Sequence, residues 1–159
     1  MRVDFKFKRA PGYNVAAIQY VGPYGEQHLR KEFRSLVAWA KRHGIRSGKW
    51  IFRELDGPYS RRPDNRRRWE ADLEIKGPAK GEGRIRIKKI RPETVASVTF
   101  NPDVVSARLV YHGLSDWLRW RKKDGQVKRI GPSREVYDGD PWTNARAWAH
   151  ADVQFLVRK

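Results

Sequence analysis

The sequence of 159 residues contains no cysteine. Disulfides, thiolate nucleophiles and zinc sites with cysteine ligands are therefore excluded, and a reducing cytoplasm is the expected compartment. No uninterrupted apolar stretch approaches the ~20 residues that cross a bilayer, and the first ten residues lack the apolar centre of a secretory signal. We expect neither a membrane span nor export by that route.

Motifs of common enzyme classes are missing as well. The four histidines, His28, His43, His112 and His150, follow no metal-ligand spacing, so neither a metal nor another cofactor is predicted. No serine lies in a nucleophile elbow, and the glycine-rich segment 77–83 is typical of a linker rather than of a phosphate-binding loop. Acyl transfer and nucleotide hydrolysis therefore have no support.

Acidic residues are few in comparison with basic ones. The chain has 35 Lys and Arg against 18 Asp and Glu, a formal net charge of +17. Either the whole surface is simply basic, or the protein contacts a polyanion such as nucleic acid. The basic clusters 61–68, 84–91 and 119–129 lack the interleaved exposed aromatics of single-strand binders, so we expect weak nucleic-acid binding without sequence preference, if any.

Hydrophobic periodicity predicts a mixture of strands and helices. Alternating or β-branched runs predict strands at residues 3–7, 15–21, 50–56 and 69–75. An apolar stripe through Leu29, Phe33 and Leu36 predicts a helix that ends near His43-Gly44. A further strand is predicted at 95–100, and Asp103 is the expected N-cap of a second helix that runs to Lys123.

The same order of elements occurs twice. Val15-Ala16 recurs as Val95-Ala96 and Trp39 as Trp120, and Asp56-Gly57 and the segment Trp69–Asp72 also have counterparts ~80 residues later. We therefore expect one α+β domain over residues 1–159, built of pseudo-repeats 1–77 and 82–159. In such a duplication each helix covers its own half of an antiparallel sheet, and a groove lies between the two helices.

Four short motifs carry a resemblance to a known family: Val21–Tyr24, Leu36–Trp39, Asp56–Pro58 and Glu135–Tyr137. In order and spacing the chain resembles the GyrI-like small-molecule-binding family, which includes gyrase-inhibitory proteins and effector-binding domains of multidrug-responsive transcription activators. The resemblance covers nearly the whole chain. It implies duplicated strand-helix-strand-strand (SHS2-type) units, two helices on one face of the sheet, and a pocket between them with the E-x-Y glutamate as its acid.

Glu135 is the central candidate site residue. It lies two positions from Tyr137 on a predicted strand, so both side chains point to one face. A carboxylate in apolar surroundings needs a partner, as in a receptor for lipophilic cations, whereas on an open surface Glu135 would pair with an arginine such as Arg134. The resemblance favours the pocket. The candidate ligand-binding residues are Tyr20, Tyr24, Trp39, Phe100, Trp120, Glu135, Tyr137 and Trp148, although core packing is the alternative for each ring.

Three functions stay open. The first is a binding protein for hydrophobic, planar and in some cases cationic small molecules, acting as a sensor or as a sequestering drug-resistance factor. The second is a hydrolase of cyclopropane-containing DNA-alkylating natural products, which the resemblance also implies, with Glu135 as the catalytic acid or base. The third is an interaction protein that binds gyrase, another topoisomerase or nucleic acid. The expected protein is a cytoplasmic monomer with a small-molecule ligand, and its basic charge leaves neutral and anionic ligands open.

Overall fold

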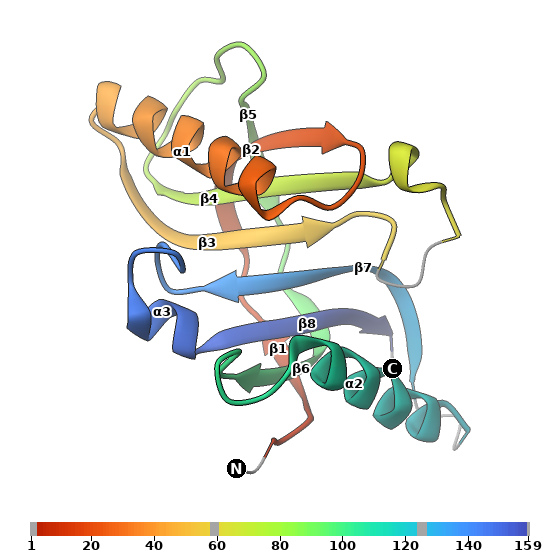
Figure 1. The fold of residues 1–159 in the computed structure, drawn as a ribbon. Coiled ribbons are helices and arrows are strands. Elements are labelled where there is room, and N and C mark those ends of the chain that lie inside the picture. The colour runs from red at the N-terminus through yellow and green to blue at the C-terminus, as the bar shows by residue number, and fades with distance from the viewer. Residues whose placement is uncertain (1–2, 58–60, 124–126, 159) are drawn as a thin grey trace.

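The computed structural model describes residues 3–57, 61–123 and 127–158 and shows an α+β fold (Figure 1). A curled eight-stranded sheet is antiparallel throughout and carries two long helices and a short third helix within these ranges. The elements are β1 (Lys6–Ala10), β2 (Tyr13–Val21), α1 (Glu26–Arg42), β3 (Arg46–Glu54), η1 (Asp64–Arg66), β4 (Arg68–Lys76), β5 (Arg86–Ile90), β6 (Glu93–Phe100), α2 (Ala107–Lys123), β7 (Lys128–Tyr137), α3 (Ala145–Ala149) and β8 (Ala151–Arg158).

Helix α1 follows its sequence pattern. Leu29, Phe33 and Leu36 are all buried, so the predicted apolar stripe faces the sheet. The helix ends at Arg42, and Gly44 follows with a φ of +62°, a left-handed conformation that glycine adopts without strain. The predicted end near His43-Gly44 is confirmed.

Helix α2 starts later than its sequence pattern predicted. It begins at Ala107, so the prediction of Asp103 as its N-cap was wrong. The side chain of Asn101 instead accepts a hydrogen bond from the backbone N–H of Asp103 at 2.9 Å, which closes a turn before the helix. No helix in the described ranges is both long and apolar enough to span a membrane.

The sheet order is β1-β6-β8-β7-β3-β4-β2-β5, which places β7 and β3 at its centre. Only Pro11 and Gly12 separate β1 from β2, although β1 lies at one edge and β2 lies next to the other edge. Arg91 and Pro92 form an equally short link from β5 to β6. Two-residue links between opposite ends of a sheet require those ends to approach one another, and the sheet therefore curls into a half-barrel.

The two faces of the sheet differ. On one face, Ile18 of β2 and Val98 of β6 share a buried apolar cluster with Phe33 of α1 and Leu114 of α2. Both long helices therefore cover this face, one over each half of the sheet (Figure 1). The helix-free face has a smaller apolar cluster around Ile51. Strand register also places a row of polar residues across it: Lys6, Ser97, Gln154, Arg134, Arg53, Glu70 and Gln19.

Candidate functional site

A small cavity of about 140 Å³ lies at the centre of the helix-covered face. Strands β3 and β7 form its floor, and its walls come from α1, α3, the end of β6, the start of α2 and the segments that connect them. Larger hollows of about 480 and 620 Å³ beside α2 and on the helix-free face are lined mainly by polar and charged side chains. The cavity-lining residues are Tyr24, Glu26, Leu29, Phe33, Trp50, Phe52, Phe100, Pro102, Ala107, Glu135, Tyr137, Pro141, Trp142 and Trp148.

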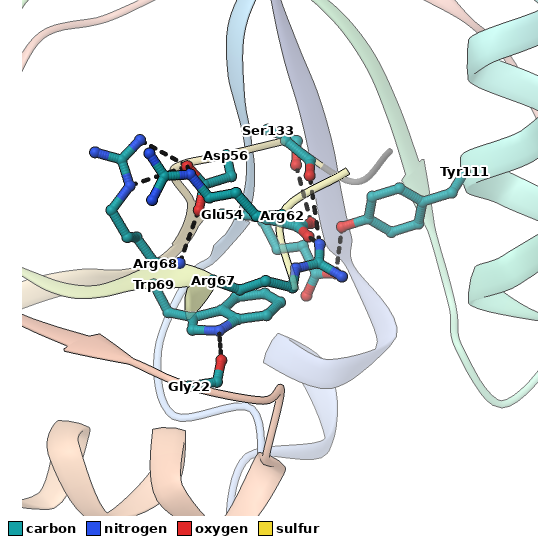
Figure 2. Close-up of polar contacts among 11 residues, drawn as sticks. Gly22, Glu54, Asp56, Arg62, Arg67, Arg68, Trp69, Tyr111 and Ser133 are labelled. Atoms are coloured by element: carbon teal, nitrogen blue, oxygen red, sulfur yellow. Dashed lines mark hydrogen bonds and ion pairs between the residues drawn. The ribbon is translucent and has the colours of Figure 1, made fainter. Parts of the chain in front are cut away.

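Glu135 lies in the floor and is held by two phenols. The hydroxyl of Tyr111, which reaches across from α2, donates to Oε1 at 2.6 Å, and that of Tyr137 donates to Oε2 at 2.7 Å. Figure 2 shows Tyr111 pointing from α2 toward the polar cluster on the sheet. Burial and the charge of Glu135 raise the pKa of both tyrosines, so the phenols stay protonated and serve as donors. The hydrogen bond from Tyr137 confirms the prediction that both side chains share one face.

The charge of the cavity opposes that of the chain as a whole. None of the cavity-lining residues is Lys, Arg or His, whereas two of them, Glu26 and Glu135, are carboxylates. Tyr24 lies at the mouth, where partial burial and the nearby charge of Glu135 raise its pKa to about 12. Because its charged lining residues are both carboxylates, the cavity suits a ligand with positive charge. No group of three or more potential metal ligands occurs among the described residues.

Aromatic rings form most of the cavity wall. Phe33 of α1 stacks on Trp50 of β3 with ring centroids 4.7 Å apart, and Trp142 leans on both rings at 6.2 Å. The indole N–H of Trp142 donates to Glu26 at 2.7 Å, and that of Trp148 donates to Asp103 at 3.0 Å. Both indole N–H groups are therefore paired with carboxylates, and the two rings contribute apolar surface beside them.

A second carboxylate, Glu54, lies behind the cavity on β3. Strand register pairs it with Ser133 of β7, whose hydroxyl lies 3.4 Å from Glu54 Oε2. Arg67 forms an ion pair with Glu54 and places its guanidinium 5.0 Å from the ring centroid of Trp69 (Figure 2). Trp69 in turn stacks on Phe52 at 5.5 Å, and Phe52 lines the cavity.

The structure brings together five of the eight candidate residues around this cavity. They are Tyr24, Phe100, Glu135, Tyr137 and Trp148. Phe100 ends β6, Glu135 and Tyr137 lie on β7, Trp148 lies on α3, and Tyr24 lies in the connection between β2 and α1. Their roles toward a ligand remain predictions.

The other three candidates do not line the cavity. Tyr20 is buried and stacks on His28 at 4.1 Å, so its ring is part of the packing between β2 and α1. Trp39 is 1% exposed and lies in the core under α1, because it continues the buried stripe three residues after Leu36. Trp120 is 76% exposed, since it lies two residues beyond the buried Leu118 and so points away from the sheet.

Sequence reasoning missed several cavity residues. Trp50 and Phe52 alternate on β3 as Glu135 and Tyr137 do on β7, and this period of two is a signal that predicts a shared face. Trp142 follows Pro141 in an irregular segment with no periodicity, so no local signal identifies it. Tyr111, the second donor to Glu135, likewise has no distinguishing pattern within α2.

An antiparallel α+β fold with an aromatic, acidic cavity on its helix-covered face is the architecture of a small-molecule-binding domain. The profile of the GyrI-like small molecule binding domain matches residues 4–158. The chain therefore belongs to the GyrI-like family. No curated protein matches the sequence.

Solved structures share the fold at low sequence identity. EcmrR in a DNA complex superposes with a TM-score of 0.75 at 19% identity over 99% of this chain, which spans 58% of that EcmrR chain. The C-terminal domain of EcmrR alone gives 0.72 at 18% identity and covers 100% and 99% of the two chains. A hydrolase encoded by lin2189 of Listeria innocua gives 0.63 at 12% identity, covering 97% and 91%. SAV2435 bound to tetraphenylphosphonium gives 0.53 at 6% identity, covering 98% and 94%.

Proposed function

We propose that this protein binds hydrophobic cations in the aromatic cavity, with Glu135 as their counter-ion, and acts as a sensor or a sequestering drug-resistance factor. One observation carries the proposal. In a chain of net charge +17, the cavity has two carboxylates and no basic side chain. The structure of SAV2435 with tetraphenylphosphonium supports the same ligand class for a related fold.

The physical basis is that the charge of Glu135 is only partly neutralised in the free protein. Glu135 accepts two phenolic hydrogen bonds, which stabilise its charge in a half-buried place but supply no full counter-charge. A ligand cation would supply that charge, and each aromatic face turned toward it would add roughly 0.5–2 kcal/mol. Binding therefore depends on Glu135 for charge and on the rings for contact area.

The size of the cavity limits what can enter. An apolar cavity of ~150 Å³ holds a benzene molecule, and the cavity here has about 140 Å³. One aromatic ring of a ligand would fit in full, while the rest of the ligand would lie toward the mouth near Tyr24, which is 58% exposed. The proposed ligand is therefore a planar cation with at least one ring.

The net charge of the chain does not exclude such a ligand. A field of +17 repels cations at a distance, but the Debye length is about 8 Å at physiological salt, so distant charges are largely screened. The two charged residues that line the cavity, Glu26 and Glu135, are both acidic, and Arg30 lies over the ring of Trp142 at 6.0 Å from its centroid. High salt should therefore screen the long-range repulsion between the protein and a cation, and should also weaken the ion pair between the bound cation and Glu135.

The test is Glu135→Gln, which keeps the volume and removes the charge. Binding of benzyltrimethylammonium, measured by titration calorimetry, should weaken by roughly 1–3 kcal/mol, or about 5- to 150-fold. A neutral planar ligand such as naphthalene should lose less affinity. Glu82→Gln is the matched control, because Glu82 is an exposed carboxylate that pairs with Arg42. Unchanged cation binding in Glu135→Gln would overturn the proposal.

Hydrolysis is the second candidate function. The fold is shared with a Listeria innocua structure named a hydrolase, and Glu135 is the carboxylate that would assist water attack. In a hydrolase, Glu135→Gln should abolish turnover of a cyclopropane substrate yet leave its binding nearly intact, because acid–base assistance acts in the transition state. Absence of turnover by the unmodified protein rules this function out for the substrate tested.

We also propose that the domain arose by duplication of an SHS2-type unit. Two features support it. The series β2-α1-β3-β4 and β6-α2-β7-β8 have the same order of elements. Reading outward from the β7–β3 junction, equivalent strands follow in the same order on both sides, as a pseudo-two-fold axis requires. The edge strands β1 and β5 each pair with the other series, which the predicted repeats 1–77 and 82–159 did not anticipate. Superposition of the two series about a pseudo-two-fold axis is the test.

A further inference from the structure

The arginines just before and at the start of β4 point in two directions. Arg62 and Arg68 form ion pairs with Asp56, and both are about half exposed, at 49% and 47%. Arg67, between them in sequence, turns inward and is only 19% exposed (Figure 2). One basic side chain of this connection is therefore withdrawn from solvent, beside the cavity.

The surroundings of Arg67 repeat the chemistry of the cavity. Its guanidinium pairs with the carboxylate of Glu54 and lies over the face of Trp69, 5.0 Å from the ring centroid. Its Nη2 also lies 3.4 Å from the carbonyl oxygen of Gly57, while its buried Nε has no partner among the described residues. A carboxylate beside an aromatic face is a cation site, and here a cation of the chain itself fills it.

This filled site adjoins the cavity. Glu54 lies opposite Ser133, so Glu135 is its diagonal neighbour across the β3–β7 pair, and such neighbours are ~7–8 Å apart with their Cβ atoms somewhat closer. The ring of Trp69 contacts two cavity-lining rings, with centroids 5.5 Å from Phe52 and 5.4 Å from Tyr24. The two carboxylates thus share one continuous aromatic wall.

We propose that Glu54 and Trp69 form a second cation subsite that Arg67 fills in the free protein and that the second charge of a dication occupies. The preferred ligand then has two positive groups ~7–8 Å apart, one for Glu135 and one for Glu54. This inference rests on the proposed function of the Glu135 cavity. It adds a specificity determinant, because Arg67 excludes a second charge until it is displaced.

Displacement of Arg67 exchanges one cation for another. Glu54 stays paired throughout, so no buried carboxylate is left without a counter-charge. The released guanidinium of Arg67 would move into solvent, as the half-exposed side chains of Arg62 and Arg68 already do. The apparent affinity for a dication is therefore lowered only by the fraction of time that Arg67 occupies the subsite.

The experiment compares two probes on four proteins. The first probe is benzyltrimethylammonium, with one ring and one charge. The second is its analogue with two trimethylammoniomethyl groups para to one another on the same ring. The proteins are the unmodified chain, Arg67→Met, Glu54→Gln and the control Arg68→Met, which removes a neighbouring arginine that pairs at the surface. Titration calorimetry gives affinities, and thermal unfolding shows that each variant is folded.

Arg67→Met should bind the dication roughly tenfold more tightly, because the internal competitor is gone, and the monocation within about threefold of the unmodified protein. Glu54→Gln should lose roughly tenfold in dication affinity and retain monocation binding. Arg68→Met should change neither. If Arg67→Met fails to fold, the result for Glu54→Gln decides.

Equal changes for both probes, or none for either, in Arg67→Met and Glu54→Gln would overturn this inference while the Glu135 cavity stands. Failure of the unmodified protein to bind the monocation would instead overturn the proposed function, and the second subsite with it. The two failures are thus distinguished by the monocation.

Discussion

At the scale of single residues, two buried carboxyl groups lie next to each other on the helix-free face. Glu70 accepts hydrogen bonds from Gln19 and Lys88 at 2.7 Å and from Arg53 at 3.0 Å. Asp72, two positions along β4, is fully buried, and neither of its carboxyl oxygens has such a donor among the described residues. Burial raises the pKa of Asp72 well above its usual value. Although burial opposes it, the neighbouring Asp72 carboxyl and the hydrogen bond from Lys88 lower the pKa of Glu70 to about 2.

These opposite shifts favour a protonated Asp72 beside an ionised Glu70, with Arg53 Nη1 3.8 Å from Asp72 Oδ2. The folded-state pKa of Asp72 exceeds its unfolded value, so its contribution to stability is fully present below the unfolded pKa and is lost as pH rises through the folded pKa. Asp72→Asn keeps a donor toward Glu70 but does not titrate. As pH rises from 5 to 9, the unfolding free energy of the unmodified protein should fall relative to that of Asp72→Asn, because only Asp72 loses a proton. Parallel profiles in urea unfolding at several pH values would contradict the shared proton.

At the scale of elements, α1 and α2 have tryptophans at equivalent positions of the predicted repeat but use them differently. Trp39 lies in the core, whereas Trp120 is turned to solvent between the exposed Arg119 and Arg121. The buried stripe of α2 runs through Val110, Leu114 and Leu118 and excludes Trp120. Equivalent residues in the two halves of the repeat therefore need not lie on the same face of their helices.

This difference predicts opposite effects of one substitution. Trp39→Ala should destabilise the fold by about 3–5 kcal/mol, because it empties a large buried volume. Trp120→Ala should change the unfolding free energy by about 0.5 kcal/mol or less, as is usual for surface changes. Urea unfolding measures both. A large loss in Trp120→Ala would show that its ring is covered in solution.

At the scale of the whole molecule, two short links close the half-barrel. A Cβ built on Gly12, in the link from β1 to β2, would lie 2.9 Å from the backbone oxygen of Ile90 and 3.1 Å from Pro92 Cδ, in and after β5. The two links therefore pack directly against one another. Glycine is needed at this crossing for its small size, since no side chain fits between the two backbones.

Gly12→Ala should therefore force the links apart and lower the unfolding free energy by about 1–3 kcal/mol, the usual cost of overpacking. Gly139→Ala is the control, because a Cβ there meets only Asn144 Nδ2 at 3.7 Å, an ordinary contact. Chemical denaturation of both variants makes the comparison. Equal stability of the two would show that the crossing can relax.

The surface charge of the whole molecule bears on nucleic-acid binding. The expectation that the basic clusters lack exposed aromatics was wrong for residues 119–129, because Trp120 is 76% exposed beside Arg119 and Arg121. An exposed ring between arginines is compatible with stacking of a base. Weak nucleic-acid binding without sequence preference stays a prediction.

Much of the fold and part of the site could be predicted from the sequence. Alternating and β-branched runs predicted strands that overlap β2, β3, β4 and β6, but the strand predicted at residues 3–7 was displaced, because β1 covers Lys6–Ala10. Alternation also placed Glu135 and Tyr137 on one face, and a period near 3.6 placed Leu29 and Phe33 on the buried side of α1. Each of these inferences uses neighbours within a few residues, where backbone geometry alone sets which side chains share a face. Glu135 as the pocket acid came from the resemblance; the structure places its side chain on the cavity lining, and its role toward a ligand stays a prediction.

Other features were decided only by tertiary structure. Tyr111 reaches Glu135 from a different element, Trp142 enters the cavity from an irregular segment, and Arg67 turns inward while Arg68 does not. The exchange of β1 and β5 between the two series of strands belongs here too. No local pattern encodes such contacts, because the rotation of a helix and the pairing of distant strands follow from the sum of many weak interactions across the sheet. The sequence thus determined the elements and their faces, and packing decided which faces meet around Glu135.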